Sequence, residues 1–398
     1  MKLLEPIVAW HHDISKIRRD IHAHPELAFE EFRTADVVAA KLEEWGIEIH
    51  RGLGGTGVVG IIRGNQPGDR AVGLRADMDA LPMQEVNTFA HASKNDGKMH
   101  ACGHDGHTAM LLAAAQYLSQ HRDYAGIVYV IFQPAEEGGG GAKRMIDDGL
   151  FTRFPMEAVF GMHNWPGMKP GQFGLTPGPI MASSNEFSIT VKGKGTHAGM
   201  PNLGVDPVMA AVQLAQSLQT IITRNRNPLD AAVLSITQIH AGSADNVVPN
   251  HAELRGTVRT FTLDVLDLIE RRMEEISRHT CAAMDCEVDF KFQRNYPPTI
   301  NHPGEAEFCA DVLRDIVGEA NVNANVQPTM GAEDFAFMLQ ELPGCYVWIG
   351  NGTGDHRDSG HGLGPCMLHN GSYDFNDELL PLGGTYWVQL ALKRLAKA

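Results

Sequence analysis

The chain has 398 residues, of which 43% are apolar, 20% charged and 7% aromatic. This composition is typical of a globular protein with a sizeable core, and it argues against a disordered chain. The net charge is −15, from 33 Lys and Arg against 48 Asp and Glu. This negative charge argues against nucleic acid or an anionic membrane as the main binding partner, because both require a concentrated basic surface.

The N-terminal stretch has no signal-peptide core, and no run reaches the ~18 apolar residues that a membrane span needs. Six cysteines are too few for a disulfide framework in a chain of this length. We therefore expect a cytoplasmic protein with mostly buried free thiols. The unusual count is 19 histidines, so the question is whether they cluster with cysteines.

Helix and strand patterns alternate in the first part of the chain. The predicted helices are 34–45, 105–118 and 142–150, and the predicted strands are 57–64, 71–77, 126–134 and 157–167. Strands that alternate with helices indicate an α/β domain with a mixed, partly parallel sheet.

The pattern changes after about residue 184 to the order β-α-β-β-α-β, which is the ferredoxin-like arrangement. The predicted elements are strand 187–195, helix 206–222, strands 232–242 and 251–260, helix 263–284 and strand 286–296. The α/β pattern then resumes with helix 304–318, strand 345–351 and a last helix near 375–397. The predicted organisation is an α/β domain in two parts, 1–183 and 296–398, with an inserted domain at 184–295.

The densest chemical cluster is MHACGHDGHTAM at 99–110, with Cys102 and His104 in a glycine-containing turn before a helix. Thiolate and imidazole both suit zinc and neighbouring first-row metals. Two other interpretations stay open for this motif alone. It could be a helix start capped by Asp105 with incidental histidines, or a Cys–His pair for nucleophilic catalysis.

The second cluster is QPAEEGGGGAK at 133–143, where Glu136 and Glu137 follow a buried strand. The glycine run lacks the frame of a phosphate-binding P-loop. Adjacent carboxylates can divide roles, one binding metal and the other taking a proton from a metal-bound water. The alternative is a solvated acidic end of a loop.

Two further histidines, His163 and His369, stand in loops after α/β elements. Each histidine alone is weak evidence for a metal site. Five candidate ligands together, however, exceed the three protein ligands of a single catalytic zinc. They suit two metals about 3.5–4 Å apart that share a water, with the thiolate as a reasonable bridge. The five candidates are Cys102, His104, Glu137, His163 and His369.

These residues and their surroundings resemble the co-catalytic metallopeptidase and aminoacylase superfamily. More narrowly, the chain is similar to its amidohydrolase branch of hippurate hydrolases and plant auxin-conjugate hydrolases. The matching strings span nearly the whole chain in order, and they include RRDIHAHPELAFEE (18–31), GLRADMDALPMQE (73–85), MHACGHDGHTAMLL (99–112), FQPAEEGGGGAKRMIDDGL (132–150), GMHNWPG (161–167), GTHAGMPNLGVDP (195–207), NVVPNHAELRGTVRT (246–260), MGAEDFAFM (330–338) and LHNGSYDFND (368–377).

The resemblance implies that the five candidates hold two divalent ions of Zn, Mn, Ni or Co, and that Glu136 is the general base. Asp77 matches an aspartate that orients a ligand, although Arg75 stands where the superfamily has a ligating histidine. The inserted domain matches a lid through which homodimers or homotetramers form. Its His197 matches a residue that reaches the partner subunit's site and stabilises the oxyanion. Asn246 and Arg259 match residues near the substrate carboxylate, and Gly331 matches a segment whose amides face the substrate.

The function implied is hydrolysis of the amide bond of N-acyl amino acids, first of all hippurate-like N-aroyl amino acids. A deacetylase of the N-acetyl-diaminopimelate type and a dipeptidase or carboxypeptidase remain alternatives on the same site. A metal-free thiol amidase with Cys102 as nucleophile and a non-catalytic binder of amino-acid conjugates are the alternatives from other classes. No nucleic acid or membrane partner is expected.

Overall fold

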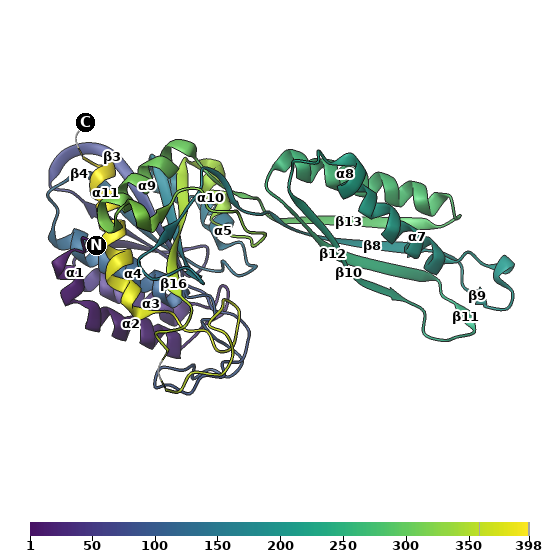
Figure 1. Cartoon of the computed structure of the whole chain (residues 1–398), viewed down its shortest axis with the longest axis horizontal. Coiled ribbons are helices and arrows are strands. Elements are labelled where there is room, and N and C mark those ends of the chain that lie inside the picture. The colour runs from purple at the N-terminus through teal and green to yellow at the C-terminus, as the bar shows by residue number, and fades with distance from the viewer. Residues whose placement is uncertain (358, 397–398) are drawn as a thin grey trace. The chain divides into compact units, whose positions relative to one another are not determined.

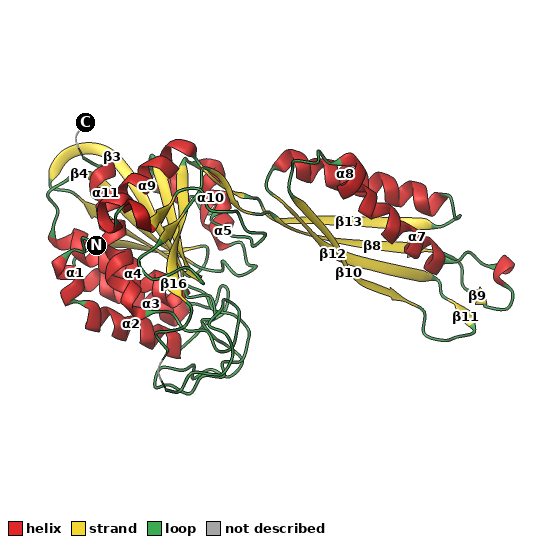
Figure 2. Ribbon diagram, in the orientation of Figure 1, coloured by secondary structure: helices red, strands yellow, loops and turns green. Residues whose placement is uncertain are grey.

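The computed structural model describes residues 1–357 and 359–396, which form two compact units. The first unit comprises Met1–Ile180, Ile300–Gln327 and the chain from Asp334 onward, and the second comprises Met181–Thr299 and Pro328–Glu333. Helices cover the sheet of each unit (Figure 1, Figure 2). The predicted two-domain α/β fold is confirmed. Among the described residues, no helix is both long and apolar enough to cross a membrane.

The first unit is built on an eight-stranded mixed sheet with the order β1-β2-β4-β3-β5-β16-β6-β15. Its strands are β1 (Glu48–Leu53), β2 (Gly57–Arg63), β3 (Gln66–Asp77), β4 (Ala125–Gln133), β5 (Ala158–Pro166), β6 (Phe173–Gly174), β15 (Val322–Asn323) and β16 (Gly344–Gly352). Strands β4, β3, β5 and β16 are parallel neighbours, whereas β1 pairs antiparallel with β2 and β2 with β4. The parallel strands read as apolar runs because both of their faces are covered. They also end at one edge of the sheet, where α/β proteins place ligands.

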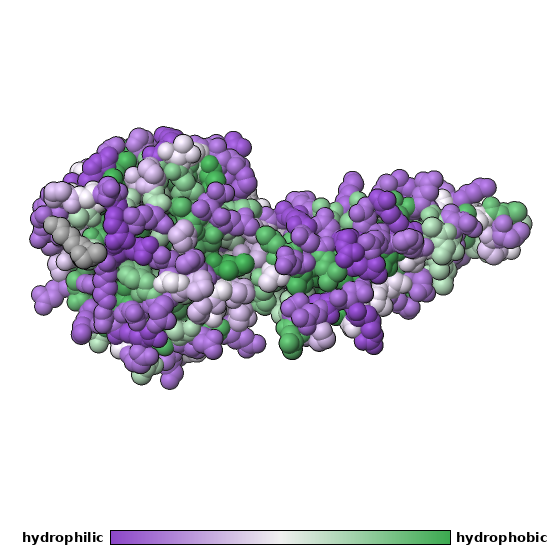
Figure 3. Space-filling view, turned by 90° about the horizontal axis from the view of Figure 1, so that it is seen from above, coloured by the Kyte–Doolittle hydropathy of each residue, from purple (hydrophilic) through white to green (hydrophobic). Residues whose placement is uncertain are grey.

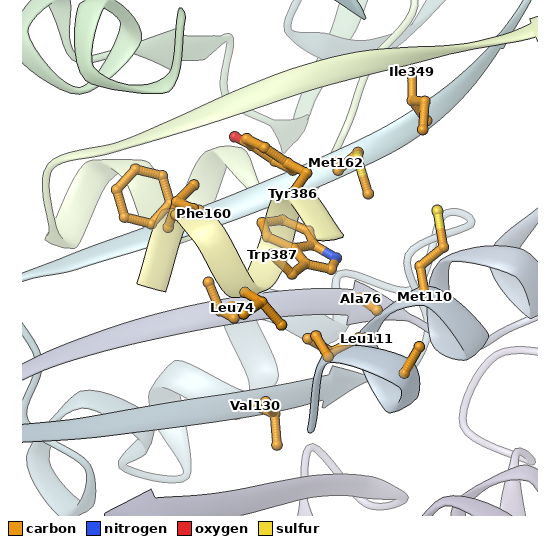
Figure 4. Close-up of a cluster of buried hydrophobic side chains, with 14 of the residues drawn as sticks. Leu74, Ala76, Met110, Leu111, Val130, Phe160, Met162, Ile349, Tyr386 and Trp387 are labelled. Carbon is orange, nitrogen blue, oxygen red and sulfur yellow. The ribbon is translucent and has the colours of Figure 1, made fainter. Parts of the chain in front are cut away.

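The helices of the first unit pack around this sheet. They are α1 (Glu5–Ala9), α2 (His11–Ala23), α3 (Phe32–Glu44), α4 (His104–Gln120), α5 (Gly141–Asp147), α6 (Leu150–Arg153), α9 (Pro303–Val317), α10 (Ala336–Glu341) and α11 (Leu380–Arg394), with 3₁₀ turns at Glu319–Asn321 and Asp377–Leu379. Helix α4 is almost wholly buried, which explains its alanine- and leucine-rich sequence. Helices α4 and α11 meet the sheet through the buried side chains of Figure 4, among them Met110, Trp387 and Phe160.

The structure and the sequence prediction differ at the following helices. Helices α1 and α2 were not predicted, because α2 buries Arg18 and His22 on the same face as its isoleucines. The predicted helix 142–150 divides into α5 and α6 at Gly149, whose φ of 93° is incompatible with a continuous helix. The predicted last helix, 375–397, becomes α-helical only at Leu380.

The second unit has the order β8 (Ser184–Lys192), α7 (Pro207–Thr220), β10 (Ala232–Ala241), β12 (His251–Thr260), α8 (Leu263–Ala282) and β13 (Glu287–Tyr296). Its four strands form an antiparallel sheet in the order β10-β12-β8-β13. This is the ferredoxin-like topology that the sequence predicts. Shorter elements are β9 (Thr196–His197), a 3₁₀ turn at Pro201–Leu203, a π-helical turn at Ile221–Asn225 and β11 (Val247–Val248), while β7 (Gly178–Met181) and β14 (Thr299–Asn301) stand where the chain passes between units.

Local sequence explains why the helices of the second unit begin where they do. The Asp206 side chain accepts hydrogen bonds from the first amides of α7, and Thr262 caps α8 in the same way. Alternate strand residues such as Ile189 and Leu254 pack in a core with both helices. In Figure 3, hydrophilic residues cover most of the visible surface of each unit.

Candidate metal centre

The predicted ligands lie near the carboxyl ends of the parallel strands, together with His369 in the segment before α11. Cys102 precedes α4, Glu137 follows β4, and His163 lies near the end of β5. Gly103, with a φ of 88°, turns the chain so that Cys102 and His104 flank the start of α4. A Cβ at Gly103 would lie 2.3 Å from the Asn164 side chain, so only glycine fits this turn.

Two groups of potential ligand atoms share one thiol. The ligand atoms of Cys102, His104 and His163 lie within 4.8 Å of one another, and so do those of Cys102, Glu137 and His369. The Cys102 Sγ is 3.3 Å from His163 Nε2, and the His369 Nε2 is 3.2 Å from Glu137 Oε1. The structure thus brings together all five residues that the sequence singles out. A thiol common to both groups is the arrangement expected for a ligand shared by two ions.

The hydrogen bonds of the two buried imidazoles leave one nitrogen of each directed to the cluster. His163 Nδ1 donates to the Asn164 carbonyl at 2.6 Å, and His104 Nδ1 donates to Asp79 at 3.1 Å. Because a carbonyl and a carboxylate only accept, each ring in the neutral form that binds a metal has its lone pair at Nε2. His104 Nε2 is buried and, among the described residues, has no hydrogen-bond partner. Such an atom fits a metal ligand, as does the mixture of thiol, imidazole and carboxylate.

The electrostatics of the cluster favour a cation. Burial, with the neighbouring Glu137 and Glu136 carboxylates, raises the pKa of the Cys102 thiol well above its usual value. Burial opposes a charge on His104, yet Asp77 and Asp79 raise the pKa of its imidazole to about 10. Divalent ions would offset this negative charge, and a coordinated thiol loses its proton outright.

Asp77 is fully buried beside the cluster, with its Oδ2 3.8 Å from His104 Nε2. Its Oδ1 accepts from His107 Nδ1 at 2.6 Å, and its Oδ2 accepts from Arg75 Nη1 at 2.7 Å. His107 Nε2 in turn accepts the backbone N–H of Asn164 at 2.9 Å. Arg75 is itself fully buried and is bonded to Gln133 and Asp334. The arginine that replaces a ligating histidine therefore anchors Asp77 instead.

Asp79 is a site residue that the sequence reasoning missed. Besides orienting His104, it accepts the backbone N–H of Glu137 at 2.8 Å through its other oxygen. Carboxylates that hold a ligating imidazole in this way fix its tautomer and direction. The available signal was position: Asp79 follows Asp77 by two residues, just beyond the end of β3.

Glu136 lies beside the two groups of ligands and is 7% exposed. It forms a further group with His104 and Glu137 within 4.8 Å, and its Oε1 accepts the backbone N–H of Asp334 at 3.3 Å. A carboxylate adjacent to a ligand, but with its own hydrogen bond, is suited to proton transfer.

A model of peptidase family M20/M25/M40 matches residues 73–392, which is most of the chain. The chain belongs to this family. It is 41% identical over 396 residues to the hippurate hydrolase of Campylobacter jejuni, covering 99% of this chain and 100% of that protein. It is 38% identical over 387 residues to the N-acetylcysteine deacetylase of Bacillus subtilis, covering 96% and 97%. A solved Bacillus subtilis structure described as a dinuclear metal-binding peptidase of the M20 family matches with a TM-score of 0.83 and 34% identity, covering 98% of this chain and 99% of that one.

These matches confirm the family and the enzyme class, a hydrolase, that the sequence predicts. Metal binding is characteristic of at least one M20 relative of the same fold, and the present chain has the side-chain groups to do the same.

Four predicted residues of this M20/M25/M40 peptidase lie in the second unit. His197 in β9 pairs with Val247 in β11, and the carbonyl of Asn246 accepts the N–H of Ala198 at 3.0 Å, so His197 and Asn246 are neighbours. Arg259 is on β12, and the Gly331 carbonyl accepts the N–H of Ala182. The metal-ligand cluster belongs to the other unit, so the roles of these four residues remain predictions.

Proposed function

We propose that this protein hydrolyses the amide bond of N-acyl amino acids, with N-aroyl amino acids such as hippurate as the first class. The observation that carries the proposal is the adjacent pair Glu136 and Glu137. Glu137 groups with Cys102 and His369, whereas Glu136 joins the cluster beside it. One carboxylate can thus hold an ion while its neighbour moves a proton.

In this proposal two divalent ions are held by Cys102, His104, Glu137, His163 and His369. When bound, such ions polarise an amide carbonyl and lower the pKa of a water molecule toward neutrality. Glu136 takes the proton of the attacking water and later returns it to the leaving amine nitrogen. Asp79 and Asp77 keep the imidazoles of His104 and His107 oriented during these steps.

The second unit supplies the substrate contacts in this proposal. The planar fork of Arg259 suits a bidentate bond to the free carboxylate of the substrate, and the amide of Gly331 faces the substrate. Asn246 neighbours His197 rather than Arg259, so in this proposal it reaches the same carboxylate from the partner subunit together with His197. His197 donates to the carbonyl oxygen as negative charge develops there, acting from one subunit on its partner's site. A homodimer or homotetramer formed through this unit follows from that assignment.

The donor set narrows the choice of metal. Thiolate and imidazole favour Zn or Ni, while the carboxylate and water also tolerate Mn, and Co remains compatible. All six cysteines are free and buried, which supports the cytoplasm as the compartment. A thiol amidase is a weaker candidate, because a buried thiol with a raised pKa is a poor nucleophile.

The test is a turnover screen of hippurate, N-acetyl amino acids and dipeptides, with metal-free protein reloaded separately with Zn, Mn, Co or Ni. We expect hippurate-like substrates to be hydrolysed fastest, and activity to disappear on chelation and return with metal. Preference for N-acetyl substrates or dipeptides would favour the deacetylase or the peptidase instead. Full activity after prolonged chelation would point to Cys102 as nucleophile, and binding of a conjugate by metal-loaded protein without turnover would indicate a binding protein.

A further inference from the structure

The loop between β4 and α5 carries Glu136 and Glu137 and begins with a strained residue. Ala135 has a φ of 54°, in the left-handed region that only glycine adopts without steric cost. Its Cβ lies against the glycine turn that follows, because a Cβ built on Gly139 would come within 2.7 Å of it. A conformation of this kind persists only where its surroundings hold it.

One buried carboxylate holds this conformation. Glu31, which is fully buried, accepts the backbone N–H of Ala135 at 2.8 Å through its Oε1. The same oxygen accepts the backbone N–H of Phe29 at 3.1 Å, and Phe29 also has a positive φ, of 64°. The other oxygen accepts the Thr56 hydroxyl at 2.6 Å. Two strained segments more than a hundred residues apart therefore share a single acceptor atom.

The backbone on the other side of Glu136 is held in the same manner. The N–H of Glu137 donates to Asp79 at 2.8 Å. The backbone N–H groups of Ala135 and Glu137, on either side of Glu136, therefore both donate to buried carboxylates. The ring of Phe29 covers the glycine turn, since a Cβ on Gly139 would lie 3.1 Å from Phe29 Cε2. The direction in which the Glu136 side chain leaves the backbone is thus fixed at two points.

We propose that Glu31 is a positioning residue for Glu136: by holding Ala135 in its left-handed conformation, it aims the general base at the reacting atoms. This inference rests on the proposed function in that it takes Glu136 as the base. The role needs acceptor oxygens rather than a charge. Burial raises the pKa of Glu31 to about 7, and a protonated Oε2 could donate to the Thr56 hydroxyl while Oε1 still accepts both amides.

The experiment compares Glu31→Ala with Glu31→Gln, whose carboxamide keeps Oε1 as acceptor and can donate to Thr56. We expect E31A to lower kcat about 10- to 100-fold, because small misplacements of catalytic groups have effects of this size. KM and metal content should stay within about twofold, and E31Q should stay within about threefold of wild type in kcat. Glu30→Ala is the matched control, since Glu30 is an exposed neighbour that pairs with Lys98 at the surface.

A second substitution separates positioning from mere stability. In the double variant E31A with Ala135→Gly, the loop no longer needs support, because glycine adopts positive φ freely. We expect Ala135→Gly to restore most of the kcat that E31A loses. A lower melting temperature with unchanged kcat, or no recovery in the double variant, would overturn the proposal. If E31A does not fold, Glu31→Asp, which retracts both oxygens, takes its place.

Amide hydrogen exchange makes the test independent of turnover. E31A should accelerate exchange in residues 135–140 while leaving β4 and α4 protected, and E31Q should not. Unchanged exchange in that loop would overturn the inference whatever the activity. A wild-type protein that hydrolyses none of the screened amides would instead overturn the proposed function, and the exchange measurement would still decide whether Glu31 holds the loop.

Discussion

The cluster in the first unit and the predicted substrate residues in the second unit differ in how firmly they are held. His163 and Glu136 are 5% and 7% exposed, and each has a defined hydrogen-bond partner in its own unit. His197 is exposed, and in the described part of the chain its Nδ1 accepts only the N–H of the nearby Gly199, at 3.0 Å. Hydrogen bonds to neighbouring residues orient metal ligands. A side chain that contacts only the substrate can instead remain mobile until the substrate binds.

His369 qualifies this comparison within the first unit. Its side chain is 54% exposed and its φ is 58°, although its backbone N–H is fixed to the Ala101 carbonyl at 2.8 Å. The cluster is therefore rigid at Cys102, His104 and His163 and open at His369.

The largest expected effect comes from removing the proton-transfer group while keeping the rigid cluster. Glu136→Gln should lower kcat by about 10²–10⁴-fold, the usual contribution of a general base, and should leave two metals bound. Kinetics together with metal analysis by mass spectrometry measure both. Glu137→Gln is the informative contrast, because it should lower metal content itself. Near wild-type turnover in E136Q would show that Glu136 is not the base.

A change on the exposed side should be nearly as large but should leave the fold untouched. His197→Ala should lower kcat by about 10²–10³-fold, the effect of losing an oxyanion donor, with little change in KM and none in melting temperature. His240→Ala is the control, since His240 is also an exposed histidine of the second unit and its ring forms a hydrogen bond with Gln238. Equal kcat in H197A and wild type would remove His197 from the proposed site.

A change beneath the cluster tests whether rigidity matters. Asp79 accepts from both His104 and the Glu137 amide, and an asparagine can accept only one of these bonds without presenting its NH₂ group to the other donor. Asp79→Asn should therefore weaken metal affinity about 10- to 100-fold, measured by competition with a chelator. Asp36→Asn, at an exposed residue paired with Arg51, is the control. Unaltered metal affinity in D79N would mean that the metal ligands keep their orientation without Asp79.

The parts of the site that could be predicted from the sequence are those that follow strand ends. Cys102, Glu137 and His163 all stand in short motifs after apolar runs, and the topology of parallel strands then brings them to one edge. The ferredoxin-like unit could also be predicted, because its alternating strands and capped helices are local features.

The supporting residues could not be predicted, because their partners are distant in the chain. Glu31 meets Ala135 and Arg18 meets Asp374 only through packing of the whole unit. Burial of Arg18 and His22 also hid helix α2, since a helix whose inner face carries ion pairs lacks a continuous apolar stripe.

The smallest expected effect concerns recognition of the substrate carboxylate by the second unit. Arg259→Lys keeps the positive charge but loses the planar fork, so KM for hippurate should rise about tenfold with kcat nearly unchanged. Arg255→Lys is the control, because Arg255 lies four residues earlier on β12 and pairs with Glu253. Hippuramide, which lacks the carboxylate, gives the sharper comparison. If Arg259 binds that carboxylate, the wild type should bind hippuramide more weakly than hippurate. R259K should then bind hippuramide almost as well as the wild type does. An equal loss on both substrates would mean that Arg259 supports the strand rather than the substrate, and it would leave the second unit with His197 as its main contribution.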